Sequence, residues 1–200
     1  MTIAAKILEE RAATEITSVL LGRKCWRVYC GGSVGSTFQL ALGRKLLRHP
    51  GVGKRRRSRL SPYEGEFGLM VWCSWQLNSI KGAVTGSDDE SPRLVEGLRL
   101  LEGKRTLRVS IQDRWYLRID FSGGMTLSVL PTHIGPKASF NGNWEAWTPE
   151  VCYAIGTDLT CEVEPREYPP QLPKSGVRAG KWRIAVPAVR PSSRAKIVRR

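Results

Sequence analysis

Two clusters of basic residues are the side chains whose type and spacing most clearly predict chemistry. The run KRRRSR starts at residue 54, and the chain ends in SRAKIVRR. Arginine presents a planar fork of N–H donors that matches a phosphate group, and several of them on an extended segment can follow a phosphate backbone. We therefore expect a nucleic-acid or other polyanion site made of Lys54, Arg55, Arg56, Arg57, Arg59, Lys181, Trp182, Arg183, Arg194, Lys196, Arg199 and Arg200.

Trp182 has two interpretations. It lies between Lys181 and Arg183, where an indole could stack on a base as in single-stranded nucleic-acid sites. Alternatively it anchors the C-terminal segment on the folded body, which is the interpretation we favour. The sequence contains no recognition helix, zinc finger or RNA-recognition motif, so we expect binding with little sequence specificity. The KRRRSR run also has the composition of a nuclear import signal.

The positive charge of the chain is concentrated in two segments. The formal net charge is +14, of which residues 44–59 carry +8 and residues 165–200 carry +9, so the remainder of the chain carries −3. Clustered charge indicates a binding partner of opposite sign, because solubility alone does not require clustering.

The glycine-rich stretch CGGSVGSTF, residues 30–38, suggests a phosphate-binding loop at first sight. A P-loop needs a Lys followed by Ser or Thr, and then a helix, and a dinucleotide fingerprint must also open a helix. This stretch has no Lys, and the residues after it alternate as a strand does. We therefore interpret it as a turn between two strands.

The sequence shows no catalytic motif. The two histidines, His49 and His133, are not paired with a nucleophile in any recognisable pattern, and there is no G-x-S-x-G, H-E-x-x-H or C-x-x-C. We therefore expect a protein that is not an enzyme and has no cofactor and no metal. The five cysteines are an odd number without a pairing pattern, and no long apolar stretch is present. These features favour a cytoplasmic protein without membrane contact.

Apolar periodicity predicts two helices. The first covers residues 2–21, and its apolar face holds Ile3, Ile7, Leu8, Ile16, Val19 and Leu20. The second covers residues 92–102, with Ser91 as its N-cap. Its buried face holds Leu94, Leu98 and Leu101.

Alternating and β-branched residues predict the strands. A long central strand is expected from Glu64 to Leu77, and a three-stranded meander from 106 to 130 with Leu107, Val109 and Ile111 inward. The other expected strands are 25–30, 37–43, 80–84 and two or three short ones within 143–164. A basic loop is expected over residues 44–62.

The expected architecture is α+β. It consists of one domain, residues 1–164, built mainly on antiparallel sheet in a partial barrel or sandwich, with an N-terminal helix and one crossing helix. Residues 165–200 form a proline-rich linker and an extended basic tail, in which WRIAV could add to a sheet edge.

The phrases LGRKCW, GSTFQLALG, GEFGLMVWCSWQL, DRWYLRIDFSGGMTL and NWEAWTPE resemble a group of uncharacterised small bacterial β-rich proteins. Some members of such groups are suspected immunity or antitoxin-like partners. The resemblance implies a second hypothesis, in which the body is a protein-binding module or an assembly subunit, and it carries over no functional residues. Tryptophan is favoured at interface hot spots. The candidate anchors are Trp72 or Trp75, Trp115, Trp144 and Trp147.

Overall fold

The computed structural model describes residues 3–31, 35–48, 61–135 and 142–166. The helices are α1 (Ile3–Leu20) and α2 (Ser91–Arg99), with a short 3₁₀ turn η2 (Asp113–Trp115). The strands are β1 (Cys25–Cys30), β2 (Phe38–Leu47), β3 (Tyr63–Val71), β4 (Ser74–Ser79), β5 (Gly82–Gly86), β6 (Thr106–Ile111), β7 (Leu117–Phe121), β8 (Met125–Leu130), β9 (Trp144–Trp147), β10 (Val151–Ile155) and β11 (Cys161–Pro165).

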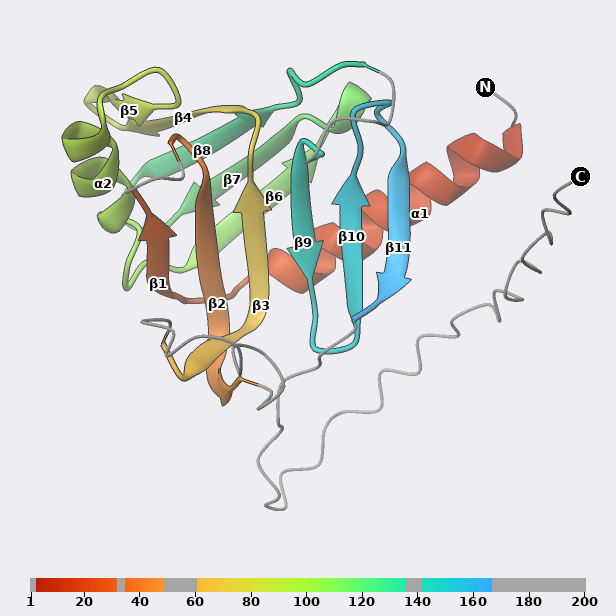
Figure 1. Ribbon diagram of the computed structural model, residues 1–200, viewed down its shortest axis with the longest axis horizontal. Coiled ribbons are helices and arrows are strands. Elements are labelled where there is room, and N and C mark those ends of the chain that lie inside the picture. Colours follow the sequence, from red (N-terminus) through yellow and green to blue (C-terminus); the bar gives the residue numbers. More distant parts are fainter. Residues whose placement is uncertain (1–2, 32–34, 49–60, 136–141, 167–200) are drawn as a thin grey trace, which may run out of the picture.

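The strands form two antiparallel sheets that face one another (Figure 1). The six-stranded sheet has the order β1-β2-β3-β9-β10-β11, and the five-stranded sheet has the order β5-β4-β8-β7-β6. Over the described residues the sheets do not close into a barrel. The expected α+β class, mainly antiparallel with an N-terminal helix, is confirmed, and the single-domain boundary at residue 164 stays a prediction.

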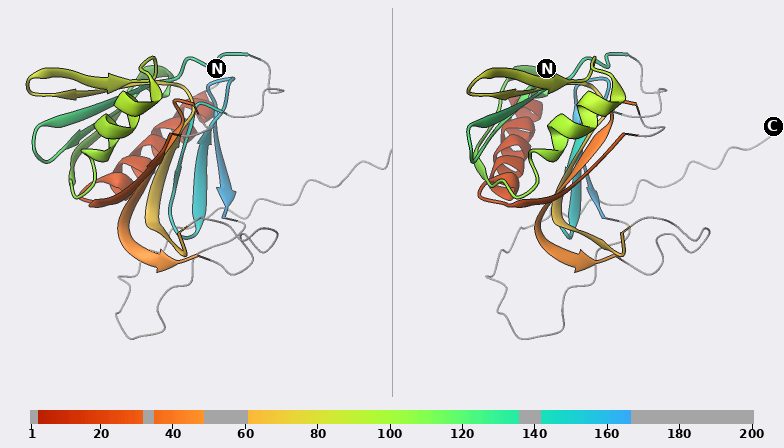
Figure 2. Two further views of the ribbon diagram at one scale, coloured as in Figure 1. Left: turned by 60° about the vertical axis from the view of Figure 1, so that its left-hand side comes forward. Right: turned by 90° about the vertical axis from the view of Figure 1, so that its left-hand side faces the viewer.

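The two helices fill the space between the sheets (Figure 2). Helix α1 packs against β6 of one sheet and against β3 and β9 of the other, whereas α2 packs against β1 and β5. In the described part of the chain, no helix has the length and apolar character needed to cross a membrane.

The apolar face expected for α1 is only half correct. Ile16, Val19 and the neighbouring Leu20 are buried, but Ile7 is 59% exposed and Leu8 is 65% exposed. The N-terminal end of the helix extends past the strands of the six-stranded sheet (Figure 1). Helical periodicity predicts which face is apolar, but it does not predict how far the partner surface reaches.

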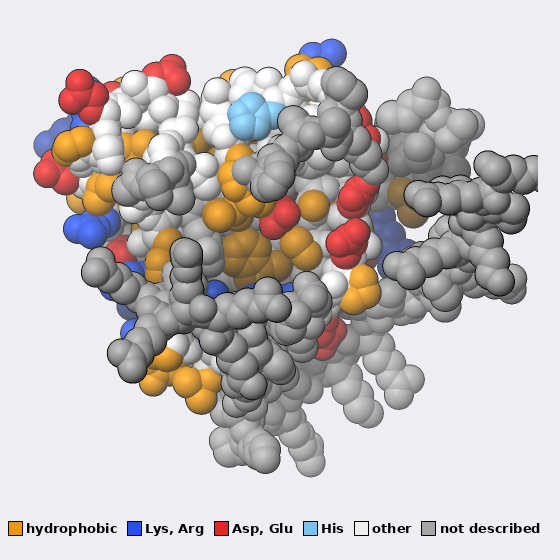
Figure 3. Space-filling model, in the orientation of Figure 1, with side chains coloured by type: hydrophobic (Ala, Val, Ile, Leu, Met, Phe, Trp, Pro, Cys, Tyr) orange, Lys and Arg blue, Asp and Glu red, His pale blue; other side chains and the backbone are white. Residues whose placement is uncertain are grey.

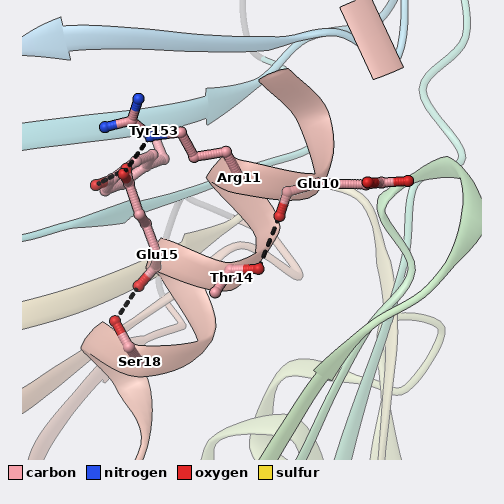
Figure 4. A network of polar contacts seen from close by, with 6 residues as sticks. All are labelled: Glu10, Arg11, Thr14, Glu15, Ser18 and Tyr153. Carbon is pink, nitrogen blue, oxygen red and sulfur yellow. Dashed lines mark hydrogen bonds and ion pairs between the residues drawn. The ribbon is translucent and has the colours of Figure 1, made fainter. Parts of the chain in front are cut away.

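A polar contact fastens α1 to the inner face of β10 (Figure 4). The hydroxyl of Tyr153 donates to Glu15 at 3.1 Å, and the Arg11 guanidinium donates to the same carboxylate at 3.0 Å. Burial, and then the charge of Glu15, raises the pKa of the Tyr153 phenol. The phenol therefore stays protonated and keeps donating at neutral pH, which sets how α1 crosses the sheet.

The inward rows of the six-stranded sheet form its half of the core. One row is Val28, Leu40, Leu69, Ala146 and Tyr153, and all five side chains are buried. Aromatic contacts then join the two sheets. The Phe38 and Trp75 rings meet edge-on at 4.9 Å, and those of Trp115 and Trp144 at 6.4 Å. The core is therefore continuous across the sandwich.

The long strand expected from Glu64 to Leu77 is two strands in different sheets. The chain leaves the six-stranded sheet after Val71 and enters the five-stranded sheet at Ser74. Between them the backbone N–H groups of Trp72 and Cys73 both donate to the carbonyl of Asn143, at 3.0 and 3.1 Å. The apolar run is continuous because both sheets face one core, so the sequence shows no break.

The side chain of Asn143 completes this junction. It is fully buried, and its oxygen accepts from the His133 N–H at 3.0 Å. Its amide nitrogen donates to the carbonyls of His133 and Gly156, at 3.0 and 2.9 Å. Through its backbone carbonyl and its side chain, Asn143 thus joins the β3–β4 crossing to the segments that follow β8 and β10.

Three local expectations need correction. Strand β2 continues to Leu47, so residues 44–47 of the expected basic loop are strand, because Leu46 is buried and pairs with Glu64 on β3. The expected inward residue Leu107 is 59% exposed, because a register shift beside it turns Thr106 into the core. The N-cap of α2 is Glu90, without a side-chain cap, where Ser91 is expected.

Two isoleucines of α1, one buried and one exposed, allow a test of which half of the helix is packed. Ile16→Ala should lower the free energy of unfolding by about 3 kcal/mol, because it opens a cavity in the core. Ile7→Ala should change it by less than about 0.5 kcal/mol, because Ile7 is mostly in water. Urea unfolding of both variants measures the difference, and equal losses would show that the first half of α1 is also packed.

Candidate functional site

Two rows of side chains run across the outer face of the six-stranded sheet. Strand register aligns Gln39, Met70, Glu145 and Ala154 in one row. It aligns Ala41, Gly68, Trp147 and Cys152 in the next. The polar and apolar residues of these rows come from four strands that are distant in sequence.

Gly68 shapes the centre of this face. A Cβ atom at Gly68 would lie only 2.1 Å from Cζ2 of Trp147, so the indole lies against the bare backbone of β3. The indole also lines a hollow of about 300 Å³, whose lining residues are Gln39, Arg48, Glu64, Met70, Trp72, Glu145, Trp147, Cys152 and Arg166. We call it the outer-face pocket.

Figure 3 views this face directly. Hydrophobic side chains gather over the middle of the sheet, and acidic side chains lie beside them toward β10 and β11. The outer-face pocket therefore has apolar side chains next to carboxylates. Its lining also includes two arginines, Arg48 and Arg166.

An ion pair forms the lower wall of the pocket. Arg166 Nη2 donates to Glu64 Oε2 at 2.8 Å, and only 16% and 7% of the two side chains are exposed. Arg166 also donates to the Thr148 carbonyl at 3.3 Å, and its Cζ lies 5.8 Å from the centre of the Trp147 ring. Burial lowers the pKa of Arg166, with Glu64 opposing that shift, and the guanidinium stays charged at neutral pH.

Glu145 and Cys152 form the wall on the β9–β10 side. Burial raises the pKa of the Glu145 carboxyl above its ordinary value of 4.5, the Cys152 contact lowers it, and the charge of Glu164 raises it further. Burial and then the Glu145 charge raise the pKa of the Cys152 thiol to about 12. The thiol is thus protonated at neutral pH and is a poor nucleophile.

Three buried polar atoms of the pocket lining have no hydrogen-bond partner within the described ranges. They are Arg48 Nε, Glu64 Oε1 and Trp147 Nε1. A buried polar atom left unpaired costs roughly 1–3 kcal/mol, so folded proteins rarely retain three of them together. These three atoms are the hydrogen-bonding groups that the pocket lining could offer to a bound molecule.

The twelve basic and aromatic residues expected to bind a polyanion all lie outside the described residues. Their chain neighbours are nevertheless informative. Arg48 directly precedes residues 49–60, Arg166 directly precedes residues 167–200, and both arginines line the outer-face pocket. The two basic segments therefore leave the described body at the same pocket.

The candidate tryptophan anchors separate into two groups. Trp75, Trp115 and Trp144 are buried, and their indole N–H groups donate to backbone carbonyls inside the body. They therefore cannot serve as surface anchors. Trp72 and Trp147 remain partly exposed, and both line the outer-face pocket.

The remaining polar groups and hollows of the described chain are weaker candidates for a functional site. The backbone of His133 is held by Asn143, and its ring Nδ1 lies 3.4 Å from the Gly142 carbonyl. Among residues 3–31, 35–48, 61–135 and 142–166, no cluster of His, Cys, Asp and Glu could hold a metal ion. A larger hollow of about 610 Å³ lies between α1 and η2. None of the unpartnered buried atoms of the described chain is in its lining.

The sequence does not predict that three of the pocket residues lie together. They are Glu64, Glu145 and Trp147. Each lies in an ordinary strand pattern, and only the pairing of β3 with β9 brings them together. No protein family model, curated protein or solved structure matches this chain. Function must therefore be argued from the pocket and from the charge of the chain.

Two carboxylates on β3 allow a matched test of the pocket wall. Glu64→Ala should lower the free energy of unfolding by about 3 kcal/mol, because it leaves Arg166 buried without its partner. Glu66→Ala should cost about 1 kcal/mol or less, because its partner Arg44 is 56% exposed. Denaturant unfolding measures both, and equal costs would contradict the distinction between the pairs.

Glu145 should make stability depend on pH. Its folded-state pKa is raised, so this carboxyl holds more proton in the native state than in the unfolded state between 4.5 and that raised value. The contribution of Glu145 to the free energy of unfolding should therefore fall as the pH rises through this window. Glu145→Gln should remove that fall, as measured by urea unfolding across a pH series. Identical pH profiles for the two proteins would contradict the assignment.

Proposed function

We propose that this protein binds nucleic acid, or another polyanion of similar charge density, without catalysing a reaction. One observation carries the proposal: Arg48 and Arg166, the residues from which both basic segments depart, line the same outer-face pocket. The binding residues are then those expected from sequence in residues 54–59 and 181–200, together with the pocket residues Arg48 and Arg166. We place the protein in the cytoplasm, because its described cysteines are all free thiols.

The charge distribution supports this function. Residues 44–59 and 165–200 carry +8 and +9, whereas the rest of the chain carries −3. Because both segments start from one face, their fields add there, and a phosphate backbone is attracted to that face. Arginine-rich contacts of this kind bind the backbone without reading sequence.

The protein-binding alternative, an immunity or antitoxin-like partner or an assembly subunit, has less support. Of its candidate anchors, three are core residues, and Trp72 and Trp147 belong to the outer-face pocket already described. A partner protein would therefore compete with nucleic acid for the same face.

The salt dependence of binding tests the proposal on the full chain. We expect binding of single-stranded oligonucleotides to weaken steeply with salt, with a log–log slope of roughly 0.7 per phosphate contact. Changing Arg194, Lys196, Arg199 and Arg200 to Gln should reduce that slope by up to about 2.8 if all four contact phosphates. Changing the five basic residues of 54–59 to Gln should act in the same direction.

The matched control removes charge elsewhere. Lys81, Arg108 and Arg118 are exposed on the five-stranded sheet, away from the outer-face pocket. Changing them to Gln should leave the slope nearly unchanged. Feeble binding by the unaltered chain at low salt, or equal slopes for all variants, would refute the function. Equal binding of heparin and nucleic acid would retain a polyanion site but remove the preference for nucleic acid.

A further inference from the structure

The unpaired atoms of the outer-face pocket define what a ligand must offer. Glu64 is more than nine-tenths buried and lines the pocket, and its Oε1 can only accept a hydrogen bond. Trp147 Nε1 and Arg48 Nε can only donate. A complementary ligand therefore carries both a hydrogen-bond donor and an oxygen or nitrogen acceptor.

The aromatic residues add a shape requirement. The Trp147 indole lies against Gly68, and Trp72 lines the same hollow. Aromatic side chains of this kind bind flat rings, because the face of a nucleobase stacks on the face of the indole. A planar heterocycle with a mixed donor and acceptor edge fits both requirements.

The two carboxylates of the pocket favour some bases over others. Glu64 and Glu145 both line the pocket, so donors on the ligand are favoured and ring-nitrogen acceptors are repelled. Guanine has two adjacent donors, N1–H and the N2 amino group, beside the O6 acceptor. Adenine and cytosine place an acceptor nitrogen beside their amino group, and thymine and uracil offer one donor. Guanine is therefore the best match.

This edge of guanine is occupied by cytosine in a duplex, so the base must come from a single strand. Rotation of side chains at the rim, which is common on binding, would expose the buried atoms to the base. We propose that the outer-face pocket binds one unpaired guanine of a single-stranded nucleic acid, with Glu64 accepting from the base, Trp147 Nε1 donating to O6 and Trp72 stacking on the ring. This rests on the proposed function and adds a base preference to it.

The test uses the full chain and thymidine oligomers of about ten nucleotides, a length within the usual single-strand site size. The central position holds guanine, hypoxanthine, adenine or thymine. The guanine oligomer should bind about tenfold more tightly than the adenine and thymine oligomers. Hypoxanthine, which lacks the N2 amino group, should fall between them. Pairing the guanine oligomer with its complement should abolish the preference.

Two variants assign the preference to the pocket. Glu64→Gln should remove it by taking away the carboxylate, and Trp147→Phe should weaken it by removing only the N–H donor while keeping a ring. The control is Trp26→Phe. Trp26 lies on β1 of the same sheet, and its Nε1 also has no partner in the described chain, but it is outside the pocket. This control should keep the full guanine preference.

The outcomes separate the two proposals. Equal, salt-dependent binding of all four oligomers would overturn the guanine pocket and leave nucleic-acid binding intact. A guanine preference that survives in Trp147→Phe and Glu64→Gln would also overturn the pocket. Absence of binding to every oligomer would refute both. If Glu64→Gln fails to fold, the hypoxanthine comparison on the unaltered chain and the Trp147→Phe variant still decide.

Discussion

Asn143 is the residue whose hydrogen bonds hold the two sheets in their arrangement. Its backbone carbonyl accepts the two N–H groups at the point where the chain passes from β3 to β4. Its side chain holds the segments after β8 and β10. A strand that leaves a sheet exposes backbone donors inside the protein, and each needs a partner. Asn143 supplies these partners at one position, and so keeps both sheets on one core.

The outer-face pocket follows from the same junction. Strand β3 ends at Val71, and the next two N–H groups donate to the Asn143 carbonyl just before β9. Strand β9 then pairs with β3 in a register that places Trp147 beside Gly68 and Glu145 beside Met70. The absent side chain at Gly68 makes room for the indole, and the ion pair between Arg166 and Glu64 closes the wall. The pocket thus arises where core packing on the inner face fixes the register of the outer face.

Local patterns predicted much of the fold. The helices, the three-stranded meander and the short final strands all follow from periodicity within a few residues. The wrong predictions concern residues whose burial depends on a neighbouring strand or sheet. Leu107 is exposed because of a register shift against β7, and Ile7 because the sheet does not extend beneath it. The long apolar run from Glu64 to Leu77 hid a change of sheet, because both of its halves face the same core.

For the site, the sequence by itself determined the chemistry of the two basic segments and the charge contrast with the body, since both depend only on composition. The tertiary structure alone decided that these segments depart from one pocket. It also decided that Glu64, Trp147 and Arg166 meet there across 102 residues of chain between the paired charges. The physical reason is that side-chain type is written locally, whereas strand register and unpaired buried atoms arise only when distant strands pair.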